Sequence, residues 1–197
     1  MVDSFFRSWE ISEGVKEAPG VFRVEFVDGV MIDRDPTPGN VAMCLSGKIT
    51  ITSMPPIVHL SKGTYPSPTK GFSTSPHVET MYRRYEEYRQ QEARLADAAF
   101  HCFTVLVGIA GGGGDIFSKL GICGPVTSTV SRLSSMKGAP EERRKEDRKH
   151  DSAPYTPAEQ AFLEKAMKLM IRRAGEYAHN PEGPFEPITM ADLPKLD

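Results

Sequence analysis

The chain has 197 residues, 39% of them hydrophobic and 25% charged, and its formal net charge is −2 at pH 7. This length and composition allow a packed core in one or two domains and exclude a wholly disordered chain. The most unbalanced region, residues 157–197, carries five basic and seven acidic side chains, so the sequence lacks the basic segment typical of a nucleic-acid-binding protein.

Residues 1–60 have the pattern of antiparallel strands. A run that alternates between apolar and polar side chains leads into Asp28-Gly29, a pair that favours a tight hairpin turn. Ser46-Gly47 separates two further β-rich runs in the same way, and residues 5–11 are expected to add an edge strand. The sequence therefore predicts a small N-terminal β module of two hairpins.

Residues 61–76 form a linker rich in proline, glycine, serine and threonine, and Ser75-Pro76 gives a helix start. Apolar side chains then recur at three- and four-residue steps over residues 77–109, with one gap at Gln91-Glu92. From Ala96 onwards this pattern becomes apolar on nearly every face, which is typical of a central, buried helix. We expect one long central helix here.

The rest of the chain completes a helical bundle. A glycine run ends the central helix, short helical stretches follow, and residues 137–156 form a charged linker. Thr156 and Glu159 form a capping box that starts the last helix, which Asn180 ends. The predicted fold class is α+β, with the β module at 1–60, the linker at 61–76, the helical bundle at 77–179 and a Pro-rich tail at 180–197.

Residues 116–133 resemble a helix-turn-helix. A short helix ends in Leu120-Gly121, and a second helical stretch carries serine and arginine on a valine-centred face, as in helices that enter the DNA major groove. Lys119 and Arg132 are the nucleic-acid-binding residues that this resemblance implies, and Lys137 is a further cation beside them. The alternative is a plain helical hairpin without a nucleic-acid partner.

Arg172, Arg173 and His179 lie near the end of the last helix, and their spacing resembles the Arg-x4–6-His signature of HEPN helical domains. The resemblance implies a ribonuclease in which an arginine and a histidine from two paired chains meet on one scissile phosphate. Arg172 and His179 are the implied catalytic residues, because residues seven apart share a helix face and Arg173 lies off that face. The alternative is that cationic side chains at a helix end complement the helix dipole.

Neither a cofactor nor a metal is predicted, because the other histidines and the three cysteines lack ligand spacing. The odd, scattered cysteines favour a reducing compartment, the cytoplasm. The most apolar stretch, residues 98–110, spans about 13 residues where a membrane helix needs about 20, so no membrane is expected as a partner. The favoured function is a non-catalytic cytoplasmic interaction protein, acting as a homodimer or on a protein partner; a HEPN-like ribonuclease and a DNA-binding regulator are the alternatives.

Overall fold

The computed structural model describes residues 2–16, 23–31, 43–50, 69–137 and 153–196. The chain divides into two compact units, Met1–Lys70 and Gly71–Asp197. The boundary falls inside the predicted linker at 61–76. Residues 61–68 of that linker, and 138–152 of the charged linker, lie outside the described residues.

The first unit begins with a helix, α1 (Val2–Lys16), so the predicted edge strand at 5–11 is wrong. The side chains of this segment make contacts at helical spacing. Phe5 and Trp9 lie one turn apart with ring centroids at 6.5 Å, and Arg7 pairs with Glu10 at 3.2 Å. Pairs three and four residues apart meet on a helix surface, and these contacts prevail over the apolar spacing of a strand.

The strands β1 (Arg23–Met31) and β2 (Met43–Thr50) form one antiparallel pair, so the two predicted hairpins are also wrong. Asp28-Gly29 lies inside β1 and Ser46-Gly47 inside β2; Asp28 is paired with Ser46 and Gly29 with Leu45. The register shifts between Glu25 and Asp28. A glycine in a strand is typical of such an irregularity as well as of a turn, and long-range strand pairing decided between the two.

The second unit is helical, and it contains no strand in the residues that the structure describes. Its elements are α2 (Pro76–Arg89), α3 (Leu95–Ala110), η1 (Gly113–Asp115), α4 (Ile116–Leu120), α5 (Gly124–Met136), α6 (Pro157–His179) and η2 (Met190–Asp192). The α+β fold class is therefore wrong: helices make up most of the residues that the structure describes, and the strands described there are the pair β1 and β2 of the first unit.

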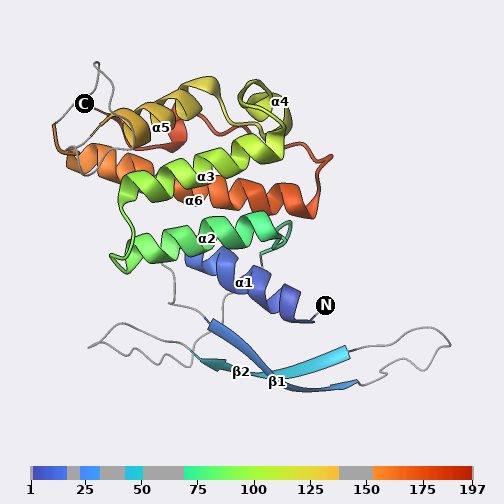
Figure 1. The fold of residues 1–197 in the computed structure, drawn as a ribbon. Coiled ribbons are helices and arrows are strands. Elements are labelled where there is room, and N and C mark those ends of the chain that lie inside the picture. Colours follow the sequence, from blue (N-terminus) through green and yellow to red (C-terminus); the bar gives the residue numbers. More distant parts are fainter. Residues whose placement is uncertain (1, 17–22, 32–42, 51–68, 138–152, 197) are drawn as a thin grey trace. The chain divides into compact units, whose positions relative to one another are not determined.

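The predicted central helix at 77–109 is two helices. α2 ends at Arg89 and α3 begins at Leu95, and between them Gln91 takes a left-handed φ of 64°. The break coincides with the gap in the apolar pattern at Gln91-Glu92, where no apolar side chain holds the chain in a helix. The two helices run antiparallel and pack on each other (Figure 1).

α3, the second half of the predicted helix, is central as expected, and α6 shares that position: each of the two packs against α2, α4 and α5, and they pack on each other (Figure 1). The start of α6 is as predicted: Thr156 accepts from the Glu159 amide, and Glu159 accepts from the Thr156 amide. The start of α2 is confirmed as well, with Ser75 as the N-cap that accepts from the Val78 amide. The buried residues of α6 form the middle of the core; they are Phe162, Leu163, Ala166, Met167, Leu169, Met170, Ile171, Arg173, Ala174 and Gly175.

The segment after α6 packs on the helical unit. The Ile188 amide donates to the Gly121 carbonyl at 2.8 Å, and the Cys123 amide donates to the Ile188 carbonyl at 3.0 Å. The side chains of Ile188 and Leu193 are buried. The Pro-rich tail is thus fixed across the junction between α4 and α5, and its residues 183–187 become walls of the candidate site.

Candidate functional site

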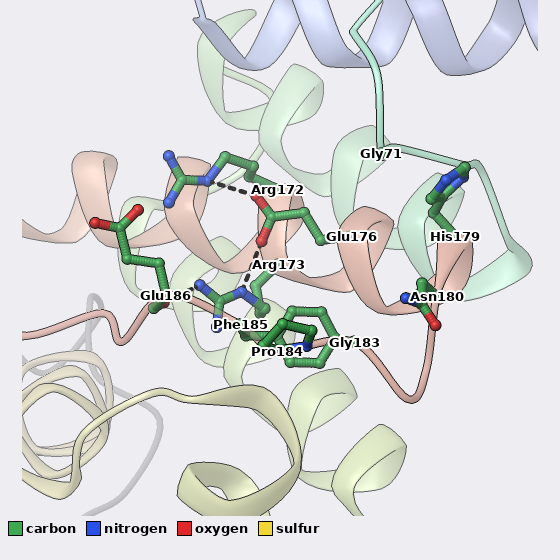
Figure 2. Close-up of a pocket in the computed structure, with 10 residues that line it drawn as sticks. All are labelled: Gly71, Arg172, Arg173, Glu176, His179, Asn180, Gly183, Pro184, Phe185 and Glu186. Atoms are coloured by element: carbon green, nitrogen blue, oxygen red, sulfur yellow. Dashed lines mark hydrogen bonds and ion pairs between the residues drawn. The ribbon is translucent and has the colours of Figure 1, made fainter.

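The C-terminal end of α6 carries the residues implied by the HEPN resemblance, and the structure brings Arg172 and His179 to one pocket of about 340 Å³ (Figure 2). Their spacing of seven residues places them on one face of α6, about 10.5 Å apart along its axis. Figure 2 shows their side chains at opposite ends of the pocket. The sequence thus predicted that Arg172 and His179 share a helix face, and the structure adds the neighbours of each side chain.

Glu176 occupies the space between the arginines. One of its carboxylate oxygens lies 3.3 Å from Nε of Arg172, and the other lies 2.8 Å from Nε of Arg173 (Figure 2). The Arg172 side chain is half exposed, so its ion pair contributes little to stability. A phosphate that approached Arg172 would have to compete with this carboxylate for the guanidinium.

Arg173 is buried, with 1% of its surface exposed, and it joins three parts of the unit. It donates to Glu176, to the Glu186 carbonyl at 2.6 Å and to the Leu120 carbonyl, and its guanidinium lies 5.0 Å from the centroid of the Phe185 ring. Burial lowers the pKa of the Arg173 guanidinium, and the Glu176 carboxylate opposes that shift. The contacts assign Arg173 to holding α4, α6 and the tail together.

His179 is exposed at the end of α6, and its Nδ1 lies 3.1 Å from Oγ of Ser73. The segment before α2 carries Ser73 to this position, because the Phe72 ring packs on Gly175 and the Ser73 amide donates to the Gly175 carbonyl at 3.1 Å. This hydrogen bond gives His179 a structural partner that the sequence could not indicate.

The two residues implied by the helix-turn-helix resemblance do not meet in a pocket. Lys119 on α4 lines a second pocket of about 520 Å³, whereas Arg132 is exposed on α5 and lines neither this pocket nor the first. Lys137 is buried and pairs with Glu159 at 2.7 Å, so it is not a phosphate contact. α5 packs one face against α3 and α6.

Three aromatic rings and three prolines line the second pocket, together with polar residues and glycines, and we call it the aromatic groove. Phe117 and Tyr177 line it together with Phe185, whose ring centroid lies 6.2 Å from that of Tyr177. The two pockets share Gly183, Pro184 and Phe185, so the two candidate sites adjoin. The remaining lining residues are Ser118, Lys119, Gly121, Pro181, Glu182 and Pro187.

The aromatic groove could not be predicted from the sequence, because the residues that line it come from α4, α6 and the tail, and α4 lies far from the other two segments in the chain. A usable signal was present: Phe117 interrupts the helix-turn-helix pattern where a small residue is usual, and Phe185 stands among closely spaced prolines. Each feature taken alone fits an ordinary packed side chain. Only the fold of the tail over α4 shows that both rings line one hollow.

The described residues contain no group of three or more His, Cys, Asp or Glu side chains placed to hold a metal ion. Cys102 is buried, and burial raises the pKa of its thiol to about 12, so it is not an activated nucleophile. In the same ranges no single helix is long and apolar enough to cross a membrane, although α3 and Gly113–Leu120 pass that test together as a pair bent by 83°.

Comparison with known proteins adds no relative: no family model, no curated protein and no solved structure matches this chain.

Proposed function

We propose that this chain is a non-catalytic interaction protein that binds an apolar segment of a protein partner in the aromatic groove. The observation that carries the proposal is the exposure of Phe117 at a pocket that Tyr177, Phe185 and three prolines also line, beside polar residues at its edge such as Lys119 and Glu182. The scattered cysteines support a reducing compartment, and the proposal therefore assigns the protein to the cytoplasm.

Phe117 has the properties of an interface anchor. Three large apolar side chains are exposed among the described residues, Phe5, Phe117 and Met190, and Phe117 is the most exposed of them at 58%. Covering this ring would contribute roughly 2 to 3 kcal/mol of binding free energy. Aromatic side chains next to a pocket are the residues that dominate the energy of many protein interfaces.

The groove is fixed before a partner arrives. Arg173 holds the Glu186 carbonyl and lies over the Phe185 ring, while Gly121 ends α4 in a left-handed conformation at φ 62°. A Cβ on Gly121 would lie 2.9 Å from Nη1 of Arg173, so this close approach requires glycine. Pre-ordered walls reduce the conformational entropy that a partner has to offset on binding.

Site-specific photo-crosslinking tests the proposal. A photoreactive phenylalanine analogue is placed at Phe117 in the full chain and, as a matched control, at Arg132, which is exposed on α5 outside the groove. In native lysate we expect the analogue at position 117 to give a discrete crosslinked protein adduct. An excess of unlabelled wild-type chain should compete for the partner and remove this adduct, whereas an excess of Phe117→Asp chain should not. The adduct protein is then purified, and Phe117→Ala should weaken its binding by about 10- to 100-fold.

Several results would contradict the proposal. Adducts of equal yield at positions 117 and 132 would show that the crosslinking is non-specific. If position 117 gave no adduct that wild-type chain competes away, the groove would not be a binding site. Because Phe117 is exposed, Phe117→Asp should keep the wild-type circular dichroism spectrum, and this measurement separates lost binding from lost folding.

A HEPN-like ribonuclease is the second candidate, and the shared pocket of Arg172 and His179 favours it. It ranks second because Glu176 already pairs with Arg172 and His179 contacts Ser73. The test is an assay for metal-independent cleavage of RNA. A ribonuclease of this kind should lose the activity in both Arg172→Ala and His179→Ala and keep it in the control variant Lys165→Ala. Absence of cleavage above the His179→Ala background would remove this candidate.

A further inference from the structure

The aromatic groove carries two charged side chains of opposite sign on different walls. Lys119 comes from α4 and Glu182 from the tail, and both are exposed. Neither side chain forms an ion pair or a hydrogen bond with the part of the chain that the structure describes. The ammonium group of Lys119 lies beside Gly111 at the end of α3, because a Cβ built on that glycine would be 3.3 Å from Nζ. The groove therefore offers a partner one cation and one anion.

The tail wall of the groove does not offer a strand edge. Three of its residues have no amide hydrogen, namely Pro181, Pro184 and Pro187. The Glu182 amide donates to the side-chain oxygen of Asn180, and the Gly183 amide donates to the Asn180 carbonyl at 3.2 Å. A partner that added a β-strand would need a row of free amides and carbonyls. The apolar segment in the groove is therefore recognised through its side chains.

The aromatic rings of the groove suit proline side chains. Phe117 is exposed, and the rings of Tyr177 and Phe185 lie beside each other with an angle of 36° between their planes. Proline-rich segments dock on such aromatic walls in the polyproline II conformation, which has no internal hydrogen bonds and little conformational entropy left to lose.

An amphipathic helix fits the groove less well. Such a helix uses anchors from i to i+7, which lie about 10.5 Å apart along its axis. The α4 wall has only five residues, a rise of about 7.5 Å. In polyproline II, a proline and the second residue after it lie about 6 Å apart, so two prolines reach one wall of this length.

We infer that the apolar segment bound in the aromatic groove is proline-rich and adopts the polyproline II conformation, with a basic side chain that pairs with Glu182 and an acidic one that pairs with Lys119. The inference rests on the function proposed above and specifies its partner. The prolines supply the contact with the rings, and the two charged flanks fix the direction of the segment. Because one short segment buries less surface than a standard interface, we expect a dissociation constant of about 10 to 100 µM.

Fluorescence anisotropy of labelled synthetic peptides with the full chain tests the inference. The peptides have about ten residues, with prolines and leucines between an arginine and a glutamate, in both orders of charge. Matched peptides carry alanine in place of every proline, which favours a helix. We expect a proline peptide to bind at about 10 to 100 µM, and its alanine counterpart at least about tenfold more weakly. Phe117→Ala should weaken the proline peptide by at least about tenfold.

Charge reversal locates the flanks of the peptide. Glu182→Lys should weaken the bound proline peptide by about three- to tenfold, and replacing the arginine of the peptide by glutamate should restore the affinity for this variant. Glu186→Lys is the matched control: Glu186 is an exposed carboxylate of the same tail that lines the first pocket and not the groove. It should bind the peptide like wild type.

The outcomes separate this inference from the proposed function. If no proline peptide bound at about 1 mM, if the alanine peptides bound as tightly, or if Glu182→Lys and Glu186→Lys had equal effects, the proline-rich partner would be wrong. A competed crosslink at position 117 together with any of these results would leave the groove as a binding site for another kind of segment. Absence of that crosslink would remove the proposed function itself.

Discussion

Gly175, in the interior of α6, has no room for a side chain. A Cβ built there would lie 2.1 Å from Cε2 of Phe72 and 2.4 Å from Cδ2, far inside any normal contact distance. Phe72 is buried, so a shift of its ring would disturb the packing around it or expose apolar surface. Replacing glycine by alanine in a helix ordinarily stabilises by about 1 kcal/mol, whereas overpacking of this kind costs about 1 to 3 kcal/mol or more. With three ring atoms within 2.5 Å, the clash should prevail, and we expect Gly175→Ala to destabilise by about 2 kcal/mol.

Urea unfolding of the full chain, followed by circular dichroism, measures this effect, and two comparisons isolate its cause. Gly108→Ala makes the same change in a helix with nothing within 4 Å, and it should stabilise by about 0.5 to 1 kcal/mol. In a Phe72→Ala background, Gly175→Ala should lose its penalty, because the ring that it meets is gone. If Gly175→Ala proved as stable as Gly108→Ala, or if its penalty persisted without Phe72, the packing argument would be refuted.

Three further predictions concern Arg173, Glu159 and Cys102. Arg173→Met leaves the Leu120 and Glu186 carbonyls without the guanidinium that donates to them, and it should lower the free energy of unfolding by about 3 to 5 kcal/mol in urea. Arg172 is half exposed, so Arg172→Met should cost about 1 kcal/mol or less. An equally small cost for Arg173→Met would contradict its structural role. Burial alone would raise the pKa of Glu159, but hydrogen bonds from Lys137 and Thr156 outweigh it and lower that pKa below 4.5. The contribution of Glu159 is therefore present above about pH 4.5 and lost as the pH falls through the folded-state pKa, so the urea midpoint should fall less on acidification in Glu159→Gln than in wild type. The Cys102 thiol, with a pKa of about 12, should react with a thiol reagent at neutral pH only after unfolding, and rapid labelling of the folded chain at this residue would contradict its burial.

Local chemistry in the sequence determined where several helices begin and end. The capping box of Thr156 and Glu159 works within one helical turn, and so does the Ser75 cap, so neither needs a distant partner. Helical periodicity also placed Arg172 and His179 on one face of α6, and both line the same pocket. These features depend on neighbours within about two turns of the chain, and the sequence shows those neighbours directly.

Tertiary structure decided the features that depend on residues far apart in the chain. Asp28-Gly29 has the composition of a hairpin turn, yet it lies within β1 because β2 pairs along it. Arg173 looked like the weaker of two site candidates, and its roles depend on Leu120 and Glu186, which no local pattern connects to it. Burial and backbone hydrogen bonds in a fold depend on pairs of segments that are distant in the sequence. A short segment contains only one partner of each pair, so its own pattern does not identify the other.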